Sequence, residues 1–191
     1  MEVDDRKAVF RSKSKKEEDM KVLAWTLAIL GAVGLITLGI VSGFSAYHFN
    51  RGCTDYLKLT GDAPTIEKAD AFLEKAIDYI EANGKTRGNS AYVFQRPATD
   101  IGIWYEQIKG QKVVLDTLIS DGDKVTNTDR SNALIKVREV VIDEGSSGSY
   151  VTLPNHIAIF PSQVAYFVLY IIFGLMWGIG CILFFPAYVD S

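Results

Sequence analysis

Oxygen-bearing side chains in the segment 121–129 are the nearest approach to a metal site in this sequence. The segment carries three aspartates and one asparagine, loosely spaced like the ligands of a calcium loop. A loop of the EF-hand type also needs an oxygen side chain where this chain has Val125 and a glycine where it has Thr126. The segment is therefore interpreted as a turn whose side chains cap a helix, and no metal is expected there.

The remaining candidates for chemistry do not form a recognisable catalytic or zinc-binding set. His48 and His156 are the only histidines, and the sequences Gly-x-Ser-x-Gly and His-Glu-x-x-His are absent. A zinc site needs further His or Cys ligands. The absence of these motifs still leaves open scattered carboxylate catalysis, such as Glu106 with Asp100. We therefore expect no catalytic residue, no cofactor and no metal, and treat the chain as a non-enzyme.

Two long stretches of the sequence contain no charged side chain and indicate membrane-spanning helices. No Asp, Glu, Lys or Arg occurs from Val22 to Phe49 or between Gly145 and Val189. About 20 apolar residues span the hydrocarbon core of a bilayer as a helix, so we predict transmembrane helices at 22–47 and 162–185, the second bracketed by Pro161 and Pro186. The remaining hundred or so residues are too few to wrap two buried core helices on all sides.

Both predicted spans are rich in glycine. Counted at about 1.5 Å per residue, Gly34 and Gly174 fall near the bilayer midplane, and Gly31 and Gly178 fall about 5 Å to its inner side. Small residues let membrane helices approach closely. We predict that these four glycines face one another, while others in the outer half are available to another subunit; the predicted packing set is Gly31, Gly34, Gly39, Gly43, Gly174 and Gly178.

Charge asymmetry predicts the orientation. The segment before the first span holds Arg6, Lys7 and further lysines, whereas the segment after the second span has no base, so the positive-inside rule places both termini in the cytoplasm. The first span is too long for a typical cleaved signal and is interpreted as a signal anchor. Cys53 and Cys181 then lie near opposite membrane surfaces and should not pair. No Asn begins an N-x-Ser/Thr acceptor, which is compatible with a bacterial inner membrane.

Between the spans, the apolar periodicity is helical. Ile66, Leu73 and Ile80 recur on one face of a helix that starts after Pro64 and stops at Gly84. A second helix follows Thr99 or Asp100, a third is predicted over 129–144, and the segment 48–60 continues the first span outward. Short connections favour an antiparallel bundle; its predicted core is Ile66, Leu73, Ile80, Trp104, Ile108, Leu115, Leu134, Val137 and Val141.

Two segments that connect predicted helices contain apolar residues. The connection before the second helix contains Tyr92, Val93 and Phe94, which we expect to dock on the bundle, the alternative being an exposed contact. The segment 146–161 starts with a Gly/Ser joint and is too short to span, so it is expected to lie at the membrane interface. Aromatic side chains favour that interface; the predicted belt is Tyr47, Phe49, Tyr150, Phe160 and Tyr166.

The predicted fold is an all-α membrane protein with two transmembrane helices flanking a small extracytoplasmic helical bundle, in the periplasm or cell exterior. Packing signals without catalytic ones favour an accessory or scaffold subunit of a larger membrane complex, with lipid and other subunits or copies of itself as partners and no nucleic acid. The alternatives are a ligand-sensing input module of a receptor, and a transport or export regulator. The predicted regions are a basic tail (1–21), first span (22–47), bundle (48–145), joint and interfacial segment (146–161), second span (162–185) and C-terminal tail (186–191).

Overall fold

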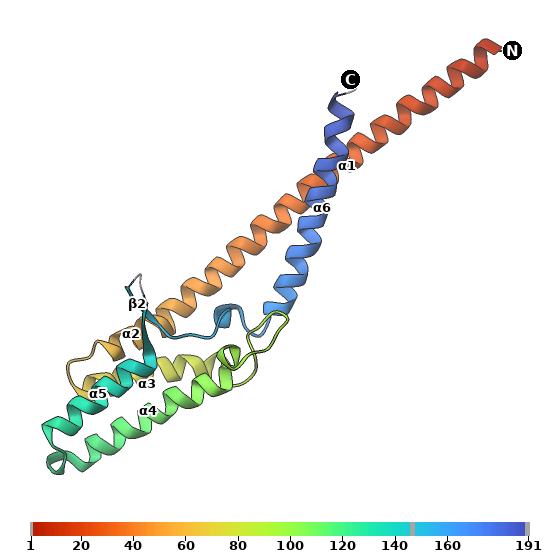
Figure 1. Ribbon diagram of the computed structural model, residues 1–191. Helices are drawn as coiled ribbons and strands as arrows, with labels where there is room; N and C mark the ends of the chain where they lie inside the picture. Colours follow the sequence, from red (N-terminus) through yellow and green to blue (C-terminus); the bar gives the residue numbers. More distant parts are fainter. Residues whose placement is uncertain (1, 146–147, 190–191) are drawn as a thin grey trace. The chain divides into compact units, whose positions relative to one another are not determined.

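The computed structural model describes residues 2–145 and 148–189 and is mostly helical, with 78% of the chain in helices (Figure 1). It divides into two compact units. The first, called here the helix pair, comprises Met1–Val41 and Ala165–Ser191, and the second, called here the domain, comprises Ser42–Val164.

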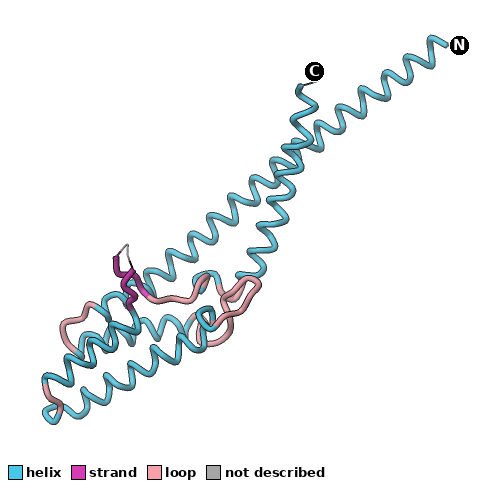
Figure 2. Tube along the Cα trace, viewed as in Figure 1, coloured by secondary structure: helices cyan, strands magenta, loops and turns pink. Residues whose placement is uncertain are grey.

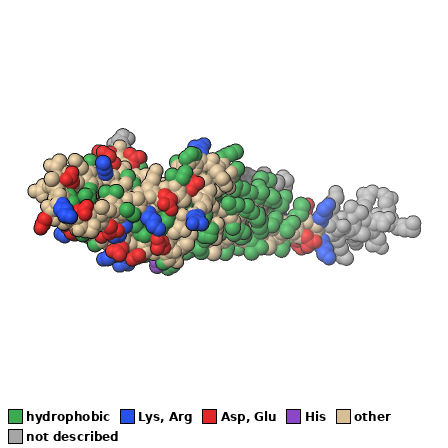
Figure 3. Space-filling model, turned by 90° about the horizontal axis from the view of Figure 1, so that it is seen from below, with side chains coloured by type: hydrophobic (Ala, Val, Ile, Leu, Met, Phe, Trp, Pro, Cys, Tyr) green, Lys and Arg blue, Asp and Glu red, His purple; other side chains and the backbone are tan. Residues whose placement is uncertain are grey.

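The helix pair contains the two longest helices, α1 (Glu2–Phe49) and α6 (Gln163–Val189). Both are long and apolar enough to cross a membrane. Only 11% of the apolar window in the first and 6% in the second is buried within the chain, whereas the core helix of a soluble protein is mostly buried. Figure 3 shows hydrophobic side chains covering these helices, and charged side chains gathered over the domain.

The helices extend past the predicted limits of the spans. The basic segment expected as a tail is helical from Glu2 onward as the first part of α1, and Met1 lies outside the described residues. α6 continues through Pro186 to Val189 instead of stopping before the proline, and residues 190–191 lie outside the description. A proline removes one helical hydrogen bond without forbidding helical backbone, so it was a weaker stop than the sequence suggested.

Glycines bring α1 and α6 into backbone contact, but they are not the four that depth alone suggested. A Cβ atom at Gly31 would lie 2.5 Å from the backbone nitrogen of Trp177, and one at Gly180 would lie 2.5 Å from that of Ala28. Gly34 accommodates the ring of Phe173 in the same way. Only the absence of these Cβ atoms allows the two helices to approach so closely.

Gly174 and Gly178 do not face α1, which corrects the predicted four-glycine contact. A Cβ atom at either position would meet no atom within 4 Å, as would one at Gly39 or Gly43. Counting depth fixes the height of a residue along a helix but not its direction around it, and neighbouring residues differ by about 100°. Phe173, Trp177 and Gly180 form the face toward α1, so Gly174 and Gly178 point elsewhere.

The domain is a helical bundle; Figure 2 draws all helices of the chain in cyan and the connections between them in pink. α1 leads through a π-helical turn into α2; α3 and α5 pack against α2, and α4 packs against α3 and α5. Gly52 lies in the π turn, where a Cβ atom would collide with the Tyr79 ring. The elements are the π turn (Asn50–Thr54), α2 (Asp55–Gly61), α3 (Ile66–Ala82), a 3₁₀ turn (Pro97–Thr99), α4 (Ile101–Asp121), a 3₁₀ turn (Gly122–Lys124) and α5 (Asn127–Val141).

Side-chain caps explain where three of these helices begin. The Thr65 hydroxyl accepts from the Lys68 N–H at the start of α3, and an Asp100 oxygen accepts from the Ile103 N–H at 3.1 Å at the start of α4. At α5 the caps are reciprocal, because Thr126 accepts from the Asp129 N–H and Asp129 accepts from the Thr126 N–H. This capping box confirms that the segment 121–129 is a turn that caps a helix.

The predicted core residues lie together in the interior of the domain. All are buried except Leu134, which is partly buried against the same cluster. Leu57 and Cys53 join them from the continuation of α1, each with no exposed surface. Burial of each such large side chain is worth about 1.5–3 kcal/mol, so this cluster is the main source of the domain's stability. Cys53 and Cys181 are both free thiols.

A short antiparallel hairpin corrects the all-α prediction and the limits of the third helix. α5 ends at Val141, and Ile142 starts β1 (Ile142–Gly145), which pairs with β2 (Gly148–Val151). The run Val140, Val141, Ile142 is β-branched and therefore suited to a strand. The predicted flexible joint thus contains β2, while residues 146–147 lie outside the described part of the chain.

The contacts between α1 and α6 predict different effects for two glycine substitutions. Gly31→Leu should separate the helices because its side chain would enter the Trp177 backbone, whereas Gly174→Leu should leave them in contact. Spin labels on native Cys181 and on Met20→Cys would measure the separation in detergent micelles. A wider distance distribution is expected for Gly31→Leu alone, and an unchanged distribution for that variant would contradict the packing described.

Candidate functional site

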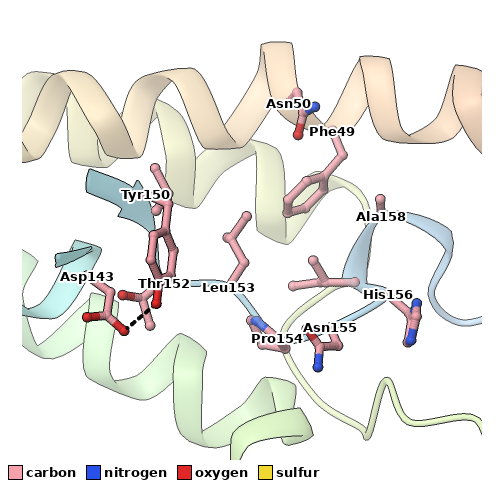
Figure 4. Close-up of a pocket in the computed structure, with 12 residues that line it drawn as sticks. Phe49, Asn50, Asp143, Tyr150, Thr152, Leu153, Pro154, Asn155, His156 and Ala158 are labelled. Carbon is pink, nitrogen blue, oxygen red and sulfur yellow. Dashed lines mark hydrogen bonds between the residues drawn. The ribbon is translucent and has the colours of Figure 1, made fainter. Parts of the chain in front are cut away.

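A groove of about 480 Å³ on the domain is the candidate site, and Figure 4 shows the residues that line it. One wall is the end of α1 with the π turn, a second is the β hairpin, and the third is the chain that follows β2. Its lining residues are Phe49, Asn50, Asp143 and the run from Tyr150 to Ala158. All of them belong to the domain.

A buried lysine holds the third wall in place. Lys85 follows α3, is 5% exposed, and donates to the carbonyl oxygens of Ile157 and Phe160, each at 2.7 Å, and of Ala158 at 3.3 Å. These carbonyls belong to or adjoin the 3₁₀ turn Ile157–Ile159. An ammonium group has three N–H donors, so all three donors of Lys85 are used by one stretch of backbone.

Burial also sets the electrostatic character of this lysine. Removal from water lowers the pKa of Lys85, because desolvation penalises the charged form. The Nζ atom lies 5.7 Å from the centre of the Phe49 ring at the end of α1. On another side it contacts the carbonyl oxygens of the 3₁₀ turn Ile157–Ile159 and its neighbours. With its hydrogens engaged and its surface covered, Lys85 positions the groove wall and is not presented to a ligand.

Two further hydrogen bonds fix the start of the same wall. The Thr152 N–H donates to the Val141 carbonyl at 2.9 Å, and the Trp104 indole N–H donates to the Thr152 carbonyl at 2.9 Å. α4 and α5 therefore both hold the chain as it leaves β2. The wall is pinned at Thr152 and again at residues 157–160, and this makes it an ordered surface.

The polar groups at the groove suit recognition by hydrogen bonding. Tyr150 donates to an Asp143 carboxylate oxygen at 3.0 Å, drawn as a dashed line in Figure 4, and this bond raises the pKa of Tyr150. Asn155 and Asn50 add amide groups. His156 has left-handed backbone, with φ of 61°, and its ring contacts that of Tyr92, with centres 4.1 Å apart and planes tilted by 35°.

The two carboxylates considered from the sequence, Asp100 and Glu106, have different surroundings. The Asp100 carboxylate caps α4 through the Ile103 N–H. Glu106 is exposed on α4. Within the described residues, no group of three or more His, Cys, Asp or Glu side chains could hold a metal ion.

The predicted belt of interfacial aromatics divides into different environments. Phe49 is 1% exposed, with its ring 5.9 Å from Tyr79, so it belongs to the domain core and the prediction for it is wrong. Phe160 is partly buried against that core. Tyr47 and Tyr150 are each 56% exposed, and Tyr166 is half-buried. The end of α1 enters the domain earlier than the length of a span suggested, which explains the position of Phe49.

Sequence reasoning missed two residues that matter most to these sites, Lys85 and Gly180. No local pattern marks Lys85, because its partners lie more than 70 residues away. Gly180 was visible as a glycine of the second span, and a projection around the helix axis that groups it with Trp177 and Phe173 would have favoured it.

Comparisons with protein-family models, with curated proteins and with solved structures found no match to this chain.

The role of Lys85 predicts a loss of stability when its ammonium group is removed. Lys85→Met would leave three carbonyl oxygens without their donor, and each unsatisfied buried group costs about 1–3 kcal/mol, partly offset by removal of a buried charge. We expect a net destabilisation of about 2 kcal/mol or more. Urea unfolding would measure it, and amide exchange should accelerate across residues 152–160.

Lys68→Met is the matched control, because Lys68 is exposed on α3. It should leave both the unfolding midpoint and the exchange rates unchanged. Equal stability of the two variants would mean that Lys85 does not hold the groove wall.

Proposed function

We propose that this chain is a membrane-anchored accessory or scaffold subunit of a larger membrane protein complex. In this proposal residues 22–47 of α1 and residues 162–185 of α6 cross the bilayer. The domain lies outside the cytoplasm, in the periplasm or at the cell exterior, and both termini are cytoplasmic. The observation that carries the proposal is that two long apolar helices bury only 11% and 6% of their apolar windows within the chain.

The exposed apolar surface needs a non-aqueous environment. Large hydrophobic side chains point outward on all sides of α1 and α6, and no charged residue interrupts them between Val22 and Phe49. Each would cost about 1.5–3 kcal/mol if left in water, whereas hydrocarbon accepts it. Examples are Val22, Leu23, Trp25, Ile29, Leu30, Val33, Ile36 and Ile40 on α1, and Val168, Ile171, Ile172, Leu175, Ile179 and Ile182 on α6.

Charge placement supports the orientation. Basic residues are concentrated before the first span, and the chain after Gly180 has no Lys or Arg. Cytoplasmic flanks are enriched in bases, while longer loops translocate largely regardless of their charge. The absence of charges within the spans also argues against an ion or proton pathway, which favours an anchoring role over transport.

A second glycine face on α6 supports a partner in the membrane. Gly180 contacts α1, but a Cβ atom at Gly174 or Gly178 would meet no atom within 4 Å in the described part of the chain, and these two glycines are separated by one helical turn. In lipid, this spacing lets a further helix approach its backbone closely. The partner helix belongs to another subunit or to a second copy of the chain.

Association should therefore depend on Gly174 and Gly178 independently of the contact between α1 and α6. The double variant Gly174→Leu with Gly178→Leu should shift the chain from a complex to a smaller species in mild detergent. Size-exclusion chromatography with mass measurement would detect the change. Val168→Leu, an exposed position on the same helix, is the control and should retain the complex.

A double variant that keeps the full mass of the complex would show that Gly174 and Gly178 do not bind a partner helix. A wild-type chain extracted as a monomer would argue against the scaffold role itself.

The groove favours one second candidate, a ligand-sensing input module of a receptor or of a transport or export regulator. Its volume of about 480 Å³ and its hydrogen-bonding lining suit a small polar molecule. A compound that raises the melting temperature of the wild-type domain, but not that of an Ala158→Trp variant with a filled groove, would favour this function over scaffolding.

A further inference from the structure

Residues 89–100 form a loop that is closed at its base by hydrogen bonds. The Ser90 N–H donates to the Thr99 carbonyl at 2.9 Å, and the Thr99 hydroxyl donates to the Asn89 side-chain oxygen at 2.9 Å. The same Asn89 oxygen accepts from the Ala91 N–H at 3.0 Å, and the Arg96 N–H donates to the Thr99 hydroxyl at 3.0 Å. This is a compact loop of the omega kind, with its ends joined and its tip projecting.

The tip presents apolar side chains to solvent, contrary to the docking that we expected. Tyr92 packs on His156, but Val93 is 61% exposed and Phe94 is 79% exposed. Phe94 is the most exposed large hydrophobic residue in the described part of the chain. An ordered loop that holds two adjacent apolar side chains in water is characteristic of a binding surface.

The base of the loop is attached to the start of α6. The Gln163 side-chain amide donates to the Asn89 carbonyl at 2.8 Å, and Gln163 is 4% exposed. Phe160 occupies the space that a side chain at Gly88 would need. Gln163 is also the first residue of the apolar helix that can span a membrane. The loop therefore adjoins the point at which that helix would enter the bilayer.

The charges around the tip suit an anionic surface. Arg87 and Arg96 flank the apolar residues, are exposed, and take part in no ion pair among the residues described. No Asp or Glu occurs between Glu81 and Asp100. Basic residues close to a bilayer surface are attracted by anionic headgroups, and apolar side chains beside them bury themselves at the headgroup–acyl boundary.

We propose that this loop docks on lipid, with Val93 and Phe94 inserted at the headgroup–acyl boundary and Arg87 and Arg96 at the phosphates. The inference rests on the proposed function, because it requires α6 to enter a bilayer next to Gln163. A third attachment beside the two spans restrains the domain at the membrane surface. It thereby fixes how the groove and the bundle are presented to a partner.

Fluorescence quenching in vesicles tests this docking. The full-length chain is reconstituted in vesicles of phosphatidylcholine and phosphatidylglycerol, with increasing amounts of lipid carrying a nitroxide at carbon 5 of the acyl chain. Bimane is attached to one cysteine at a time: native Cys181, Phe94→Cys with Cys181→Ser, or Val113→Cys with Cys181→Ser. Cys53 stays in place because it is buried and inaccessible to the label.

Val113 is the matched control for Phe94. It is a similarly exposed apolar residue, at 59%, but it lies about 18 Å along α4 from Ile101, at 1.5 Å per residue. The Ile101 N–H bonds to the Gly88 carbonyl at 2.9 Å, so the start of α4 adjoins the loop.

We expect the label at position 94 to emit at shorter wavelength than the label at position 113, because it lies in apolar surroundings, and to lose fluorescence as nitroxide lipid is added, while the label at position 113 keeps its fluorescence. Equal behaviour at 94 and 113, with Cys181 quenched, would overturn the docking while leaving the spans intact. A label at 94 that is shielded from aqueous iodide but not quenched by lipid would also overturn it, in favour of a protein contact. If Cys181 itself were not quenched, the membrane assignment would fall and the docking with it.

Discussion

Everything in this chain depends on the apolar surface of two helices that bury almost none of it internally. α1 and α6 are in contact where Gly31, Gly34 and Gly180 allow the other helix to approach. Most of the remaining surface of both helices is not covered by the chain. Water does not stabilise such a surface, whereas a bilayer does. The lack of charges along the helices agrees with this constraint.

The domain shows the opposite organisation, with a closed core and polar exterior. Its hydrophobic cluster extends from Phe49 and Cys53 through α2 to α5, and capping side chains fix the helix starts. Lys85 then fastens the chain between the hairpin and α6 to the end of α3. A buried cation with all of its hydrogens engaged is a costly device unless the backbone around it must be held in one conformation, and the groove wall is that backbone.

Periodic features of this chain were accessible from the sequence. The helices around Leu73 and Ile108 follow from apolar spacing, and the turn before α5 follows from its capping residues, because both depend on neighbours within a few positions. The hairpin after Val141 was not predicted because the segment before it is helical. Only three consecutive β-branched residues indicate that the backbone changes from helix to strand. Gly180 was missed because depth was counted without direction.

Long-range features could not be deduced in this way. The partners of Lys85 and of Gln163 lie more than 70 residues away in the chain, so no window of sequence connects them. Phe49 was assigned to the membrane surface because a span of ordinary length ends there, whereas the domain core begins at the same residue. Val93 and Phe94 were expected to dock because apolar side chains usually do; their exposure becomes meaningful only once the closed loop beneath them is seen.

Accessibility of single cysteines across the membrane tests the central claim most directly. In a Cys181→Ser background, Lys15→Cys and Thr117→Cys place thiols at exposed positions on α1 before the first span and on the domain. An impermeant maleimide applied to spheroplasts should modify the thiol at 117 at once and the thiol at 15 only after lysis. Equal modification of both before lysis, or of neither, would contradict two helices that carry the chain out of the cytoplasm and back.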